Sequence, residues 1–301
     1  MKSLPKPLTI NEQIENLKKI GLRIDDPLAE KLLNEVSYYR IIKGFSDGLK
    51  NEYGQYKRDV TFSHIKSLYD FNTSLRHLIL PEIEKIEIAF RCKLANYFSI
   101  KYGALGHMDP SKFSNAEYHT SFCNELKNEI DRNKRVPFVK NFLDNYTDRE
   151  LPFYAAVELI SFGTISKFYK NLLPSDKDNI AKQYNIHYKF LESWLEHLSY
   201  VRNICAHYGR LYNVNYTKKP KLYKEYREHA VADSCFYSTL LCIKHLLPTD
   251  DVDRWRKFVA NLTLILEDYP LVNKQYLGFP KVDEPTYWAE FLLSPLEKLP
   301  Y

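Results

Sequence analysis

The chain has 301 residues, of which 45% are hydrophobic and 27% charged, and its formal net charge is +5. This composition is ordinary for a folded globular protein and excludes a mostly disordered chain, which has fewer apolar residues and a larger net charge. At about 150 residues per domain, the length corresponds to one or two domains. With 24 tyrosines and 17 phenylalanines, aromatic side chains should fill much of the core.

The sequence carries no signal for export or membrane insertion. No stretch approaches about 18 consecutive apolar residues, so no transmembrane helix is predicted. The first residues, MKSLPKPLTINEQIENLKK, lack the apolar segment of a secretory signal. The five cysteines form no CxxC pair and are interpreted as reduced thiols. We therefore expect a cytoplasmic protein with no membrane partner.

Helical signals begin near the amino terminus. Thr9 and Glu12 have the spacing of a capping box, and Gly21 is placed to end the first helix. A second helix should begin at Asp26, which is followed by a proline. The glycine-containing segment 44–60 predicts a loop with room for a short hairpin.

The middle of the chain is also predicted to be helical. From Thr61 onward, apolar residues recur at three- and four-residue spacing. Pro81 should break or kink this helix, because proline lacks the amide donor and its ring clashes with the preceding turn. Ser114 opens another capping box, and residues 152–162 (PFYAAVELISF) predict a helix interrupted by Gly163.

The carboxyl-terminal part repeats this pattern, with an amphipathic helix from His187 to about His207 and an irregular basic segment over 209–230. Further helices are predicted over about 231–247, 251–268 and 285–293. Strand patterns are scarce, so the fold class is all-α, a multi-helix bundle. The expected units are an N-terminal helical appendage (1–60), a helical core (61–250) and a C-terminal helical extension (251–301).

The helix that ends at His207 has an unusual charged residue. At 100° per residue, one apolar stripe contains Leu191, Trp194, Leu195, Leu198, Val201 and Cys205. Arg202 falls in the middle of this stripe and needs a partner, because burying an unpaired charge is very costly. Glu158 is the only acidic residue of 152–162 and is the expected partner. Asn203 and His207 lie beside the stripe.

The net charge is concentrated in one place. Residues 202–229 contain seven basic and two acidic residues, whereas the rest of the chain has 36 of each and is neutral. This segment is either a solvated basic loop or a surface for a polyanion such as RNA. It starts at Arg202, the charged residue in the apolar stripe of the preceding helix.

The segment RNICAH (202–207), with its RNxxxH pattern, and the following HYGRLYN resemble the HEPN ribonuclease motif of bacterial abortive-infection proteins of the AbiD/AbiF type. The resemblance covers about residues 35–250. The other similar stretches, in the same order, are SYYRIIKGF (37–45), residues 62–95, residues 151–172 and residues 180–213.

The resemblance implies a metal-independent endoribonuclease without cofactors, acting in phage defence or as the toxin of a toxin–antitoxin system. In such enzymes the ribose 2′-OH attacks the adjacent phosphate and leaves a 2′,3′-cyclic phosphate and a 5′-OH. A small structured RNA is implied as a candidate regulator. The implied catalytic residues are Arg202, Asn203 and His207, with Glu158, Arg210 and Asn213 in support. An imidazole can move protons near neutral pH, and a guanidinium can hold a phosphate.

RNA is the expected partner of the basic segment. Candidates for base stacking are Tyr208, Tyr212 and Tyr216, and candidates for phosphate contacts are Arg210, Lys218, Lys219, Lys221 and Lys224. HEPN sites are commonly formed by two motifs across a dimer. Since this chain has one RNxxxH, we expect a homodimer.

Two other functions are compatible with the same residues. One is a non-catalytic RNA-binding helical protein that uses the same basic segment, and the other is a protein-interaction scaffold with a degenerate HEPN core. RNA cleavage with cyclic phosphate ends separates the nuclease from both. The sequence contains no HExxH, GxxxxGK[ST] or GxGxxG motif, so zinc protease, P-loop and Rossmann functions have no support.

Overall fold

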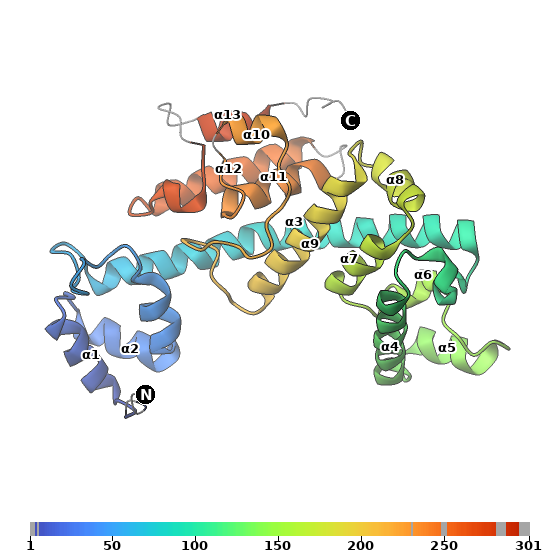
Figure 1. Cartoon of the computed structure of the whole chain (residues 1–301). Coiled ribbons are helices and arrows are strands. Elements are labelled where there is room, and N and C mark those ends of the chain that lie inside the picture. The colour runs from blue at the N-terminus through green and yellow to red at the C-terminus, as the bar shows by residue number, and fades with distance from the viewer. Residues whose placement is uncertain (1–3, 5, 230, 248–251, 281–286, 295–301) are drawn as a thin grey trace.

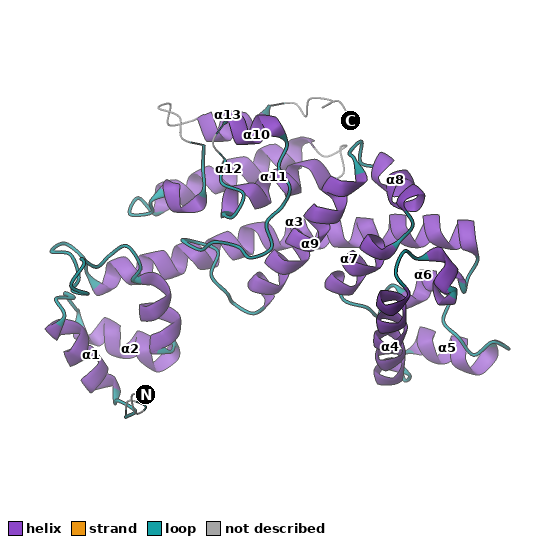
Figure 2. Cartoon of the chain, viewed as in Figure 1, coloured by secondary structure: helices purple, strands orange, loops and turns teal. Residues whose placement is uncertain are grey.

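The computed structural model describes residues 4, 6–229, 231–247, 252–280 and 287–294. Within these ranges the chain is built from helices and connecting turns, with isolated bridges and no β-strand, so the all-α prediction is confirmed (Figure 2). None of the described helices is long and apolar enough to cross a bilayer.

The longest element is α3 (Phe62–Tyr102), a helix of 41 residues that runs through the whole molecule (Figure 1). At about 1.5 Å per residue it is about 60 Å long. The expected break at Pro81 is wrong, because the helix continues through it. Pro81 is exposed, while Glu82, Ile83 and Ile86 are buried just after it, so packing on the inner face keeps the helix continuous.

Two short helices pack beside the amino end of α3. These are α1 (Ile10–Lys19) and α2 (Asp26–Glu35), followed by a π-helical turn, η1 (Tyr39–Lys43). The capping box at Thr9 is confirmed, since Thr9 accepts from the Glu12 amide and the Glu12 carboxylate accepts from the Thr9 amide. Gly21 ends α1 with a φ of 88°. In the loop over 44–60, one antiparallel bridge joins Lys50 and Tyr56.

At the other end of α3 lie the helices between residues 106 and 171 (Figure 1). They are η2 (Gly106–Met108), η3 (Pro110–Lys112), α4 (Ala116–Asn133), α5 (Pro137–Asn145), α6 (Phe153–Ala156) and α7 (Phe162–Asn171). The cap of α4 is Asn115, not Ser114. The helix predicted over 152–162 ends already at Ala156, and Gly163 lies inside α7, which is capped by Ser161.

The central helix of the carboxyl-terminal half is α9 (Tyr188–Ala206), as the sequence predicts. It packs on α7 and α3, on α8 (Pro174–Lys182), and on α11 (Phe236–Leu246). The remaining elements are α10 (Lys224–Glu228), α12 (Val252–Asp268), η4 (Lys274–Leu277) and α13 (Tyr287–Leu293). These lie above α3 in Figure 1.

Aromatic side chains fill the core as expected. Phe90, Phe98, Phe153 and Phe168 are at most 2% exposed, and Phe153 stacks on Phe168 at 4.7 Å between ring centroids. The buried apolar residues form one cluster that extends from α1 to α13. The described cysteines are all free thiols.

Four described histidines are buried, and burial lowers the pKa of three of them, which should make the fold sensitive to acid. Burial lowers the pKa of His107 and of His197 to about 4, and that of His245 to about 3. Between about pH 6.5 and pH 4 the unfolded chain therefore binds more protons than the folded chain. We expect the free energy of unfolding to fall as the pH drops through this window, by up to about 1.4 kcal/mol per pH unit for each histidine.

Urea unfolding at pH 7, 6 and 5 measures this dependence. His197→Gln should flatten it, whereas the same change at the exposed His77 should leave it as in the wild type. A free energy of unfolding that stays constant from pH 6.5 to pH 5 would contradict the assignment of three neutral buried imidazoles.

Candidate functional site

The apolar face of α9 is buried as the helical wheel predicts. Each residue of the stripe is at most 3% exposed: Leu191, Trp194, Leu195, Leu198, Val201 and Cys205. This packing fixes the position of the carboxyl end of α9 and of the RNxxxH residues there. The side chains of Arg202 and Asn203 therefore project from the last turn of a packed helix, and His207 is the cap that follows it.

The partner of Arg202 is Glu87 on α3. Arg202 Nε lies 3.6 Å from Glu87 Oε2, and Arg91 pairs with the other oxygen of the same carboxylate at 2.5 Å. Glu87 is 7% exposed, while the side chain of Arg202 is 39% exposed. Two guanidinium groups thus compensate one buried carboxylate, and part of Arg202 stays open to solvent. Glu87 lies among buried apolar positions of α3, and this is the sequence signal that could have identified it.

The expected pairing of Arg202 with Glu158 is wrong. Glu158 is exposed, because α6 ends at Ala156 and the chain turns before α7 begins. The backbone carbonyl of Val157 accepts from the Arg91 guanidinium, so this turn still contacts the ion-pair cluster.

Asn203 and His207 are both exposed at the carboxyl end of α9. His207 is the last residue of the helix turn, and its backbone N–H donates to the Asn203 carbonyl at 3.0 Å. The structure therefore brings Arg202, Asn203 and His207 to one end of one helix. The imidazole and the amide are open to a ligand from solvent.

A buried amide on α3 holds the turn that follows His207. The Asn72 side-chain oxygen accepts from the backbone N–H groups of Leu211 and Tyr212, at 2.7 and 3.2 Å, and its NH₂ donates to the Gly209 carbonyl at 3.2 Å. Asn72 is 3% exposed. One side chain thus satisfies three backbone groups of this turn, and no signal in the sequence indicated it.

Arg210 and Asn213 attach the same turn to the segment that follows η1. The Arg210 guanidinium donates to the Gly44 carbonyl and lies 3.3 Å from an Asp47 carboxylate oxygen. The Asn213 amide donates to the Asp47 carbonyl at 3.4 Å. Both residues therefore position the motif by contacts to the amino-terminal part of the chain.

Two further arginines lie at Tyr208, directly after His207. The Arg76 and Arg40 guanidinium carbons are 5.6 and 5.8 Å from the centroid of the Tyr208 ring, and Arg40 also donates to the Tyr208 carbonyl at 2.8 Å. Tyr208 is 67% exposed and its φ is 57°, a backbone conformation that is uncommon without glycine. Sequence reasoning missed both arginines, since they are distant along the chain.

Arg76 is nearly buried, at 6% exposure. It donates to the Thr73 hydroxyl at 2.9 Å, and its Nε has no hydrogen-bond partner. Among the described residues no carboxylate lies within ion-pair distance of Arg76 or of Arg40. Two guanidinium groups without a described carboxylate partner thus lie at Tyr208, the residue after His207.

The family model of the Abi-like proteins matches residues 31–213, more than half of the chain. The chain belongs to the Abi-like protein family. Neither the curated proteins nor the solved structures gave a match. Family membership points to abortive infection, a form of phage defence.

Several contacts that hold the motif of this Abi-like protein lie inside the matched range. Arg40, Asn72 and Glu87 precede the motif, and the range ends at Asn213, which completes the turn. The lysines from Lys218 onward lie outside it. The family match therefore covers the motif but not the lysines that follow it.

The basic segment of the Abi-like chain does not gather around His207. It runs back along α9, because the carbonyls of Lys218 and Lys221 accept from the buried rings of His197 and Trp194, at 2.6 and 2.7 Å. At about 1.5 Å per residue, these anchors lie about 15 and 20 Å from His207 along the helix. In Figure 1 the chain leaves the lower end of α9 and rises to α10 near its other end.

The predicted RNA contacts of this segment divide into two groups. Tyr208 is exposed, but Tyr212 and Tyr216 are 4% and 1% exposed, so they pack in the core and cannot stack on bases. The lysines are exposed, and three of them pair with acids: Lys218 with Glu196 at 2.7 Å, Lys219 with Asp233 at 3.3 Å and Lys224 with Glu228 at 3.4 Å. Lys221 forms no ion pair within the described residues.

A groove of about 650 Å³ begins at Asn203 and extends between α9, α7 and α4. Tyr200, Glu196 and Lys218 line it on the α9 side. No cluster of three or more His, Cys, Asp or Glu in the described part of the chain is placed to hold a metal ion.

Removing the Asn72 side chain tests how much its hydrogen bonds to the turn contribute to stability. Asn72→Ala leaves two backbone N–H groups without acceptors, and each buried orphan donor costs about 1–3 kcal/mol. We expect the free energy of unfolding to fall by about 3 kcal/mol, and the Leu211 and Tyr212 amides to exchange hydrogen faster.

Asn96→Ala is the matched control, since Asn96 is exposed on the same helix. It should change the free energy of unfolding by less than about 0.5 kcal/mol. If the two substitutions lowered the free energy of unfolding equally, the Asn72 hydrogen bonds would make no specific contribution to stability.

Proposed function

We propose that this Abi-like protein is a metal-independent endoribonuclease of the HEPN type, acting in phage defence or as the toxin of a toxin–antitoxin system. One observation carries the proposal. An exposed imidazole, His207, lies at a helix end where Arg202 is held by Glu87 and where Arg40 and Arg76 have no acidic partner among the described residues. Such a site favours the binding of an anionic substrate next to a group that can transfer protons.

The proposed reaction breaks one phosphodiester bond. The ribose 2′-oxygen forms a bond to the adjacent phosphorus as its proton leaves, and the bond from phosphorus to the 5′-oxygen breaks as that oxygen gains a proton. The products are a 2′,3′-cyclic phosphate and a 5′-OH. His207 transfers a proton, Arg202 stabilises the charge that develops on the phosphate, and Asn203 donates to a phosphate oxygen.

The surroundings of the motif have supporting roles in this proposal. Glu87 orients Arg202, and Arg40 and Arg76 add positive potential without a direct proton transfer. Tyr208 offers an exposed ring for a base next to the scissile phosphate. The groove at Asn203 provides room for the neighbouring nucleotides. A small structured RNA that occupies this surface would restrain the enzyme.

Substitutions at the motif test the catalytic assignment. We expect His207→Ala and Arg202→Ala each to lower the rate of RNA cleavage by about 10²–10⁴-fold, since proton transfer and charge stabilisation contribute factors of this size. The measurement is cleavage of single-stranded RNA in the presence of EDTA, with the product ends mapped. Both side chains are partly or fully exposed, so both variants should fold.

Arg135→Ala, an exposed arginine after α4, is the control and should cleave like the wild type. Cleavage that persists in both motif variants would remove the active-site assignment. RNA binding that weakens with salt but leads to no cleavage would instead select the non-catalytic RNA-binding function.

A homodimer completes the proposed site. The reaction needs one proton removed and one supplied, and the motif offers a single imidazole, His207, per chain. Two copies facing each other would provide both groups. The exposure of Asn203 and His207 leaves this end of α9 accessible to a second copy.

Dilution tests the dimer. We expect the activity per chain to fall when the protein is diluted below its dissociation constant for self-association, because monomers lack half of the proton-transfer groups. Light scattering at each concentration gives the mass of the species present. Undiminished activity per chain where light scattering finds only monomer would contradict the shared site.

A further inference from the structure

We propose that Phe190, Lys221 and Arg227 form a second RNA-contact site, which binds a nucleotide of the strand being cleaved at a distance from His207. This inference rests on the proposed function and extends it to the length of RNA that the enzyme recognises. The site is a cavity at the amino end of α9, whereas the RNxxxH residues lie at its carboxyl end.

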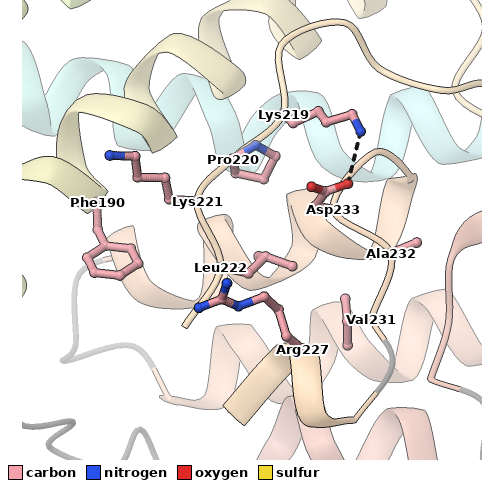
Figure 3. Close-up of a pocket in the computed structure, with 9 residues that line it drawn as sticks. All are labelled: Phe190, Lys219, Pro220, Lys221, Leu222, Arg227, Val231, Ala232 and Asp233. Atoms are coloured by element: carbon pink, nitrogen blue, oxygen red, sulfur yellow. Dashed lines mark ion pairs between the residues drawn. The ribbon is translucent and has the colours of Figure 1, made fainter. Parts of the chain in front are cut away.

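The cavity has a volume of about 760 Å³ (Figure 3). The charged ends of Lys221 and Arg227 point to the side on which the Phe190 ring lies, whereas Lys219 turns away and pairs with Asp233 at 3.3 Å. Two cations and one aromatic ring therefore border the same space. Phosphate oxygens bind between such cations, and a base can stack on such a ring.

The cations of this cavity are available for a ligand. Lys221 and Arg227 are exposed and form no ion pair within the described residues. The adjoining hollow of about 490 Å³ adds Lys189 and Lys224 and has no acidic residue in its lining. Lys189, Lys221 and Arg227 at this end of α9 thus form no ion pair within the described residues, whereas Lys224 pairs with Glu228.

The site is also held in a fixed conformation. The Lys221 amide donates to the Ser193 hydroxyl at 2.8 Å, and its carbonyl accepts from the Trp194 ring at 2.7 Å. Phe190 stacks on Tyr223 with ring centroids 4.2 Å apart. A solvated loop would need no such anchoring. A preformed site instead loses less conformational entropy when it binds a ligand.

The length of α9 sets the spacing between the two sites. Phe190 and His207 are 17 residues apart, which corresponds to about 25 Å along the helix. At about 3.4 Å per stacked nucleotide, one strand must cover about seven nucleotides to reach both. Short RNAs can reach the motif alone, and only longer ones can occupy both sites.

The test compares two RNAs with the same cleavage site, about 4 and about 12 nucleotides long. We expect the wild type to cleave the longer RNA with a kcat/KM about tenfold higher or more. The double variant Lys221→Ala/Arg227→Ala should lose this preference for length. Its affinity for the longer RNA should also depend less on salt, with a logarithmic slope shallower by about 1.4 for two lost phosphate contacts.

Lys127→Ala/Arg135→Ala is the matched control, since it removes two exposed charges at α4. It should keep the wild-type preference for length. The same preference in the Lys221→Ala/Arg227→Ala variant would overturn the second site alone, whereas a wild type that cleaves neither RNA would overturn the proposed function. ATP that binds the wild type but not the variant, with an unchanged length preference, would assign the cavity to a free nucleotide.

Discussion

The Asn72 side chain determines how the chain continues after α9. Three backbone groups of the turn over 209–212 have their hydrogen bonds to this one buried amide. Buried N–H and C=O groups without partners are costly, so the turn has few alternatives. Its direction then sends the following residues back along α9, where His197 and Trp194 hold them.

The positive charge is distributed differently in space than along the chain. Along the chain the excess lies within 202–229, yet in space it is spread along the whole of α9. Arg202 lies at the carboxyl end, Lys218 is anchored near the middle and Lys221 lies near the amino end. At the motif end the additional cations are Arg40 and Arg76, which come from η1 and α3. Net charge per segment therefore does not show which charged residues lie together in space.

Sequence patterns predicted the structure correctly where the interactions join residues that are close together in the chain. The capping box at Thr9 and the buried stripe of α9 depend on spacing within a few residues, and both are confirmed. Glu87 as partner of Arg202, and the burial of Tyr212 and Tyr216, depend on contacts across the fold. Pro81 lies between these cases, since tertiary packing overrides its local preference.

The contacts that build the motif join parts of the chain separated by long stretches of sequence. Arg40 meets Tyr208 across 168 residues, and Arg210 meets Gly44 across 166. During synthesis the amino-terminal half of this site leaves the ribosome long before the motif does, and closing so long a loop is slow. A nascent chain therefore lacks these long-range contacts until residue 213 has emerged.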